Sequence, residues 1–151
     1  MAFTGTYVCN SFITNFLSGA INVSTDTFRL ALYTSSATMD ATTAAYTTTN
    51  ELPTAGGYTA AGATTTCTVT TVLTQTGYKI IIDVADVSWA AATFTCRGAM
   101  LYDDTAAGNP SVMIYDFGSD KTVTGATFPV TFVAVANGSG PIVFETQVLT
   151  S

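Results

Sequence analysis

The chain has 151 residues, of which 48% are hydrophobic and 9% charged, with a net charge of −6 and no histidine. The absence of histidine excludes a Ser-His-Asp or Cys-His catalytic site. The four scattered cations exclude nucleic-acid binding through phosphate neutralisation and a basic membrane anchor, and no apolar stretch approaches the ~20 residues of a membrane span. The length predicts a single domain over residues 1–151, and its neutral, threonine-rich surface favours packing against other proteins.

The N-terminal segment, residues 1–26, is predicted to hold the one short helix. Asn10 or Ser11 is a suitable N-cap, and Gly19 stands where a C-terminal glycine belongs. Such a short helix must dock its apolar face on the rest of the protein. The apolar residues on that face are Phe12, Phe16 and Leu17. The segment lacks the charged and apolar regions of a secretion signal, so we expect synthesis in a cytoplasm, where the protein stays soluble or joins an assembly.

Residues 27–33 alternate with a period of two and predict a half-buried strand with Phe28, Leu30 and Leu32 inward. Residues 34–62 follow with runs of threonine, Pro53 and Gly56-Gly57, which is turn chemistry with little periodicity. We therefore expect a long Thr-rich loop or arm there. Loops of this length inside a compact domain usually serve contacts.

The remainder of the chain reads as short strands separated by turn signals. The expected strands cover residues 64–74, 78–84, 87–89, 93–95, 98–102, 112–117, 126–135 and 142–145. Gly118 is predicted to end one of them, and Pro129 indicates an edge or a bulge. Without interleaved helices, this pattern predicts an all-β, single-domain β-sandwich or jelly-roll-like fold.

Candidate catalytic and metal-binding groups are few. The two glutamates, Glu51 and Glu145, are not placed together by any pattern, and the aspartates near residues 103–120 lack the spacing of a calcium loop. The three separated cysteines favour free, buried thiols. The kinase-like sequence Asp116-Phe117-Gly118 occurs without the other kinase motifs and indicates a strand end. We therefore predict no catalytic residues, no cofactor and no metal.

Several motifs nevertheless resemble one family, the small virion structural proteins of tailed bacteriophages. The similarity covers most of the chain in the right order. The motifs are the opening MAFTGTYVCNSF at 1–12, FRLALYT at 28–34, TTNE at 48–51, GYTAAG at 57–62, DVADVSWAAATFTCRGAMLYDD at 83–104 and DFGSDKT at 116–122. In two places the chain departs from the family pattern: GYTAAG stands for the usual Y-T-A-G-G, and PIVFETQVLTS runs past the usual end.

The resemblance implies a non-enzymatic virion protein that is made in the bacterial host cytoplasm. Some similar proteins are capsid cement (decoration) proteins, homotrimers that bind the major capsid protein on the outer capsid surface over subunit junctions. We therefore expect capsid cementing, without nucleic-acid or membrane partners. The N-terminal segment through Phe16 and the arm from about Met39 to Tyr58 are the expected contact regions. The candidate interface residues are Phe12, Phe16, Tyr46, Tyr58 and Arg97, with Arg97 expected to pair with an acidic residue across a sheet or subunit.

Two alternatives remain open. One is a tail-, neck- or fibre-associated virion protein, which is also structural. The other is a carbohydrate-binding adhesin module, because β-sandwiches often bind glycans through aromatic and polar loop residues. The loop residues that could supply such a site are Tyr102, Asp103, Asp104 and Asn109.

Overall fold

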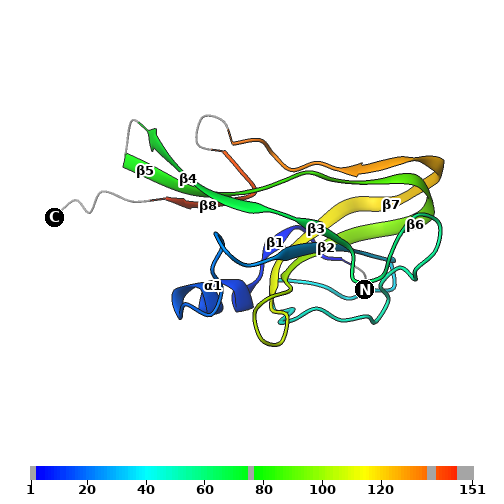
Figure 1. Cartoon of the computed structure of the whole chain (residues 1–151), viewed down its shortest axis with the longest axis horizontal. Helices are drawn as coiled ribbons and strands as arrows, with labels where there is room; N and C mark the ends of the chain where they lie inside the picture. Colours follow the sequence, from blue (N-terminus) through cyan, green and yellow to red (C-terminus); the bar gives the residue numbers. More distant parts are fainter. Residues whose placement is uncertain (1–2, 75–76, 136–138, 146–151) are drawn as a thin grey trace.

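The computed structural model describes residues 3–74, 77–135 and 139–145, which form two antiparallel sheets and one short helix (Figure 1). The all-β prediction is confirmed. The five-stranded sheet has the order β1-β7-β6-β2-β3, and the three-stranded sheet has the order β4-β5-β8. The elements are β1 (Tyr7–Val8), α1 (Asn10–Leu17), β2 (Phe28–Tyr33), β3 (Ala63–Thr65), β4 (Cys67–Thr74), β5 (Gly77–Val84), β6 (Val87–Asp103), β7 (Ser111–Val130) and β8 (Ile142–Glu145).

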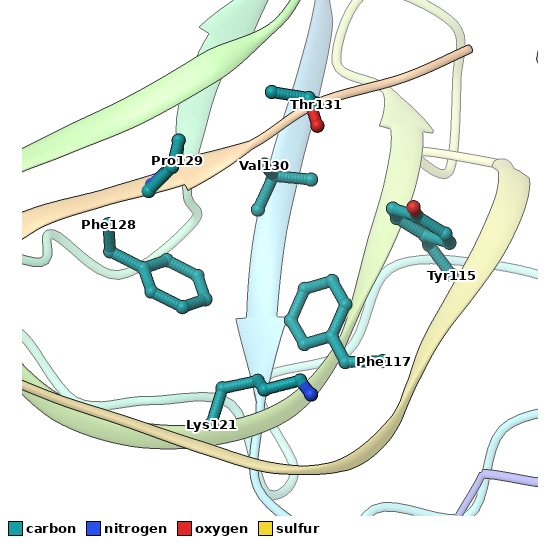
Figure 2. Close-up of a pocket in the computed structure, with 7 residues that line it drawn as sticks. All are labelled: Tyr115, Phe117, Lys121, Phe128, Pro129, Val130 and Thr131. Carbon is teal, nitrogen blue, oxygen red and sulfur yellow. The ribbon is translucent and has the colours of Figure 1, made fainter.

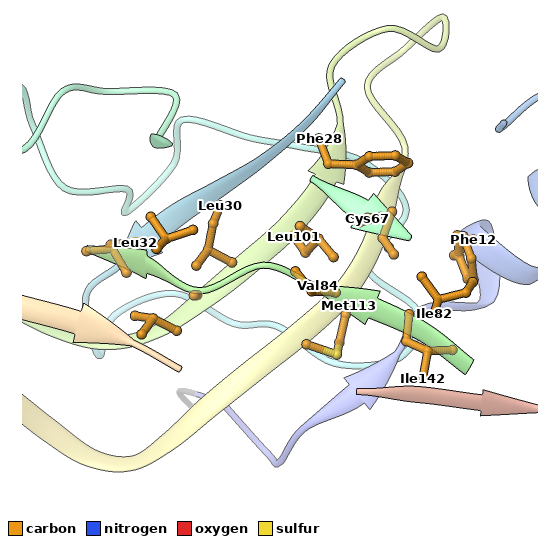
Figure 3. Packing of buried hydrophobic residues seen from close by; sticks show 14 of the residues in the cluster. Phe12, Phe28, Leu30, Leu32, Cys67, Ile82, Val84, Leu101, Met113 and Ile142 are labelled. Atoms are coloured by element: carbon orange, nitrogen blue, oxygen red, sulfur yellow. The ribbon is translucent and has the colours of Figure 1, made fainter. Parts of the chain in front are cut away.

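The main core lies between the two sheets (Figure 3). Leu30 and Leu101 of the five-stranded sheet belong to one buried cluster with Ile82, Val84 and Ile142 of the three-stranded sheet. All five side chains are at most 2% exposed. Their removal from water supplies the main favourable term for joining the sheets, at roughly 25 cal/mol per Å² of apolar surface.

The β6–β7 hairpin is longer than the sequence predicts. The expected strands at 87–89, 93–95 and 98–102 are one strand of 17 residues, and β7 runs for 20 residues through Gly118. β6 and β7 remain paired along this length because shifts in register, such as the one between Trp89 and Ala92, bend the hairpin without ending the pairing. Gly118 has a φ of +77° and lies inside β7, so the prediction that it ends a strand is wrong.

Two other strand boundaries differ from the prediction. The expected strand 64–74 is interrupted at Thr66, where the chain passes from the five-stranded to the three-stranded sheet. The expected strand 126–135 ends at Val130, and the turn predicted at 75–77 lies partly outside the described residues. The strand predicted at 142–145 is confirmed as β8.

Helix α1 begins and ends close to the predicted positions. Cys9 is the N-cap and makes no side-chain cap hydrogen bond, so the prediction of Asn10 or Ser11 is wrong by one or two residues. Gly19 takes the predicted left-handed conformation after the helix, with a φ of +77°. Leu17, expected on the buried face, is 78% exposed. No helix in the described ranges is long and apolar enough to cross a membrane.

The loop of residues 34–62 covers the second face of the five-stranded sheet. Met39 of the loop is buried against a second cluster that contains Ala31, Tyr33, Met100 and Tyr102. The expectation that β2 is half-buried is therefore wrong, because the loop buries the face that was expected to meet solvent. The segment is a loop as predicted, with no named strand between its described ends.

Candidate functional site

An aromatic cleft lies where β7 folds back over itself. Tyr115 and Phe117 come from the first half of the strand, and Phe128 comes from the second half (Figure 2). The ring centroids of Phe117 and Phe128 are 6.0 Å apart, and those of Tyr115 and Phe117 are 5.5 Å apart. The three rings are partly exposed and line part of an open cleft of about 200 Å³. A second hollow of about 130 Å³ adjoins Tyr115 on the side of Phe132.

The local sequence explains why these rings converge. Tyr115 and Phe117 are two residues apart and therefore point to the same face of the strand. The bend at Gly118 then lets the chain return, so that Phe128 meets them from the opposite layer. Pro129 is exposed beside the cleft and pairs only with Ser88 of β6, which fits the predicted edge position.

Lys121 supplies the one cation at the cleft (Figure 2). Its Nζ donates to Ser119 Oγ at 3.1 Å. The other three cations of the chain form ion pairs, Arg29 with Asp104, Lys79 with Glu145 and Arg97 with Asp116. Among the described residues, Lys121 is thus the cation without a carboxylate partner. The cleft therefore combines apolar rings with an unpaired positive charge, which can hold an apolar group next to an anionic one.

Arg97 holds the bend of the hairpin behind the cleft. Its Nε lies 3.0 Å from Asp116 Oδ1 across the β6–β7 ladder, which confirms the predicted pairing across a sheet. The same oxygen accepts the backbone N–H of Gly118 at 2.9 Å. Burial alone would raise the pKa of Asp116, but hydrogen bonding to Arg97 and Gly118 outweighs it, and the pKa is lowered. Arg97 therefore supports the cleft from behind.

The predicted aromatic contact residues do not gather in one place. Phe12 is fully buried, and Phe16 stacks between it and Phe144, with ring centroids 5.5 Å and 6.1 Å apart. Tyr58 is 2% exposed, whereas Tyr46 stacks on Tyr102 at 4.4 Å and is only partly buried. These rings fasten the helix and the loop to the domain, so Phe12 and Tyr58 present no open surface in this conformation.

Glu51 ties the loop together. Its Oε1 accepts the Tyr58 hydroxyl at 2.7 Å and the Ala61 N–H at 2.6 Å, and its Oε2 accepts the Tyr46 hydroxyl at 2.5 Å. The Tyr58 oxygen also accepts the N–H of Leu32 in β2 at 3.0 Å. Burial, followed by the hydrogen bond to Glu51, raises the pKa of both tyrosines. Both carboxylate oxygens are already bonded within the chain, so the group acts as a structural link.

The glycan site considered from sequence is not formed by those residues. Tyr102 and Asp103 are fully buried, and Asp104 lies 3.8 Å from Arg29 in an ion pair. Asn109 has a φ of +47°, and its carbonyl accepts the N–H of Tyr46. A turn sequence alone could not reveal that β6 carries Tyr102 and Asp103 into the interior.

The cysteines are free and buried, as predicted. Burial raises the pKa of all three thiols, to about 12 for Cys67 and Cys96. Within residues 3–74, 77–135 and 139–145, no three His, Cys, Asp or Glu side chains lie close enough to hold a metal ion. Comparison with known proteins finds no matching family model, no similar curated protein and no similar solved structure.

The aromatic cleft was missed by sequence reasoning. Phe128 lies 11 positions beyond Phe117 along the chain, and the strand end predicted at Gly118 hid the fact that both residues belong to one strand. The available signal was that Tyr115 and Phe117 on one side, and Phe128 on the other, flank a mostly polar stretch with a glycine near each end, Gly118 and Gly125.

Proposed function

We propose that the protein is a non-enzymatic structural component of a tailed-bacteriophage particle. Its role is capsid cementing: it binds the outer surface of the assembled shell and stabilises the junctions between major capsid protein subunits. Two lines of support lead to this proposal, the resemblance of its motifs to small virion proteins and the chemistry of the cleft.

The residues of the shared motifs serve to build a scaffold. Glu51 of TTNE and Tyr58 of GYTAAG fasten the loop. Arg97 of DVADVSWAAATFTCRGAMLYDD and Asp116 of DFGSDKT form the ion pair at the hairpin bend. Motif residues that hold the fold together are compatible with a structural role in the particle, which is the role that the resemblance implies.

The observation that carries the proposal is the partly exposed aromatic cleft with its unpaired lysine. Partly exposed apolar surface is a candidate site of protein interaction, and aromatic side chains that become buried in a complex are frequent anchors of an interface. The titratable side chains that line the cleft are those of Tyr115 and Lys121. Without an adjoining carboxylate or thiol among the lining residues, this set suits binding.

Mass action explains how such binding would stabilise a shell. A protein that binds the assembled shell but not free subunits stabilises the shell by RT ln(1 + [L]/Kd) at each site. Many identical sites on one lattice multiply the effect. In trimers over local threefold positions, which the family resemblance implies, each copy would place the same cleft on an equivalent neighbour.

The test is binding to shells assembled from the capsid protein of the same phage. Wild-type protein is expected to co-sediment with these shells, and electron cryomicroscopy of intact virions is expected to show regular copies on the shell lattice. Density confined to the tail or neck would overturn cementing and favour the alternative tail-associated role.

Substitutions in the cleft connect the binding to the proposed surface. Phe117→Ala and Lys121→Glu are each expected to weaken shell binding by about tenfold or more. Leu17→Ala changes an exposed side chain on α1, away from the cleft, and serves as the matched control. Wild-type affinity in both cleft variants would show that another face binds the shell.

A further inference from the structure

Among the described strands, none pairs with the outer edge of β4. β4 pairs with β5 over all eight of its residues without a register shift, and no other described strand pairs with it. Natural proteins usually blunt such an edge with lysine, proline, a bulge or a short strand. The β4 sequence, CTVTTVLT, has no charge and no proline. The N–H and C=O groups on this edge, which no described strand pairs with, are therefore available to another strand.

Towards the tip of the hairpin, the sheet face next to this edge carries exposed apolar side chains. β4 and β5 extend past the body of the domain above α1 (Figure 1). Near the base of the hairpin, Ile82 belongs to the main core. On the same face towards the tip, the apolar side chains become exposed. These are Val69 at 46%, Leu73 at 69%, Tyr78 at 54% and Ile80 at 39%.

We propose that β4 pairs antiparallel with β4 of a second copy of this chain around a two-fold axis at Thr71. This register places Val69 opposite Leu73 of the second copy. It also places Thr70 opposite Val72 and Thr68 opposite Thr74, so residues 68–74 are all paired. Each cross-strand pair then joins residues of the same face, as sheet geometry requires.

The strand itself argues that the occupant is a second copy. The pairing brings the exposed Val69 and Leu73 together twice and sets no like charges opposite one another, because β4 has none. Antiparallel pairing also sets the tip of each hairpin beside the base of the other. The exposed apolar tip thereby gains the neighbouring domain as a cover.

The two-fold contact is separate from shell binding and from the aromatic cleft. An isologous contact uses the same surface on both copies and joins them in pairs, whereas a threefold ring needs a different, head-to-tail contact. The assembly in solution is accordingly expected to contain an even number of copies, whether or not rings also form.

A cysteine at the axis provides the sharpest test. Thr71→Cys is expected to form a disulfide-linked dimer on mild oxidation, because residue 71 of one copy lies opposite residue 71 of the other. In the matched control, Thr68→Cys, the two thiols lie about 20 Å apart in this register and cannot bridge. The native thiols are buried and contribute little background. A folded Thr71→Cys variant that stays unlinked, or links no faster than Thr68→Cys, would overturn the proposal.

Sedimentation of the wild type and of a charge variant gives an independent readout. Thr71→Lys sets two ammonium groups against each other at the axis and is expected to halve the mass of the wild-type assembly. Thr49→Lys adds the same charge at an exposed loop position and is expected to leave that mass unchanged. A wild type that sediments as a monomer at 100 μM would also contradict the proposal.

Discussion

The loop of residues 34–62 and the β4–β5 hairpin differ in what covers their apolar side chains. The loop folds back on the five-stranded sheet, and Glu51 with its tyrosine partners holds it there. The hairpin leaves the body of the domain with Leu73 and Val69 exposed. Within a single chain, the threonine-rich loop buries one face of the five-stranded sheet, whereas the threonine-rich hairpin has exposed apolar side chains.

This difference shows that threonine content alone does not distinguish a contact arm from a structural cover. The loop has hydrogen bonds at both ends and along its length, such as Leu52 N–H to Leu32 C=O and Ser111 N–H to Ala44 C=O. The outer edge of β4 has no described partner of this kind. These contacts indicate that the loop contributes strongly to the stability of the monomer and that the tip of the hairpin contributes little.

The largest effect is expected at the end of the loop. Gly62 has a φ of +76°, and a Cβ there would overlap the carbonyl of Leu30 and approach the Ala31 Cα to 2.7 Å. Gly62→Ala is expected to lower the free energy of unfolding by about 3 kcal/mol or more, because backbone atoms cannot yield as side chains do. Urea denaturation followed by circular dichroism measures the change.

Gly108→Ala is the matched control. Gly108 has a similar φ of +81°, but no atom lies within 4 Å of the position of its Cβ. Gly108→Ala is expected to lower the free energy of unfolding by only about 1–2 kcal/mol, which is the cost of the left-handed conformation for alanine. Equal losses in the two variants would show that the close approach of the loop to β2 carries no special energy.

The next effect is expected at Tyr58. Its hydroxyl donates to Glu51 and accepts the N–H of Leu32 inside the core. Tyr58→Phe leaves that buried N–H without its partner and is expected to cost about 2 kcal/mol. Tyr46→Phe removes one hydrogen bond at a more exposed ring, and we expect about 1 kcal/mol. Thermal or urea unfolding gives both values, and a reversed order would argue against Tyr58 as the main link.

The fold class could be predicted from the sequence because alternating apolar residues and β-branched residues indicate strands locally, without knowledge of which strands pair. The helix near Phe12, the loop from residue 34 and β8 were recognisable for that reason. The continuity of β7 through Gly118 was not, since glycine is compatible with both a bend and an end. A bend is distinguished from a strand end here by the pairing with β6, which is present both before Gly118 (Asp116 with Gly98) and after it (Lys121 with Cys96).

The candidate site was less predictable than the fold. Arg97 was recognised as one half of an ion pair, but its partner Asp116 depends on the register of two long strands. Tyr46 and Tyr58 were interpreted as anchors for a partner, because the sequence gives no sign that Glu51 binds both hydroxyls. Long-range placement of this kind requires the topology.

A smaller, pH-dependent effect is expected at Asp103. Its carboxyl is fully buried, with Oδ1 accepting the N–H groups of Thr105 and Ala106 and Oδ2 without a donor from the described groups. Burial, and then the neighbouring carboxyl of Asp26, raises the pKa of Asp103. The folded state therefore holds this proton more tightly than the unfolded chain does. The resulting stabilisation is complete below about pH 4 and is lost as the pH rises through the raised pKa.

Asp103→Asn removes this dependence. The amide oxygen can keep both backbone N–H bonds, and the amide nitrogen can donate towards Asp26. The variant is expected to be about 1–2 kcal/mol more stable than the wild type near pH 7 and to lose that advantage towards pH 4. Urea midpoints across this range measure the difference. A constant difference between the two proteins at every pH would contradict the assignment to Asp103.

The smallest effect is expected on the hairpin. Leu73 is 69% exposed in the single chain, so Leu73→Ser removes little buried apolar surface. At protein concentrations low enough to keep the chain monomeric, the free energy of unfolding is expected to change by less than about 0.5 kcal/mol. At high concentration, the same variant is expected to weaken self-association, because Leu73 then lies opposite Val69 of the second copy. Loss of stability in the dilute monomer would mean that the overhanging face is already packed within one chain, and the contrast between loop and hairpin would no longer hold.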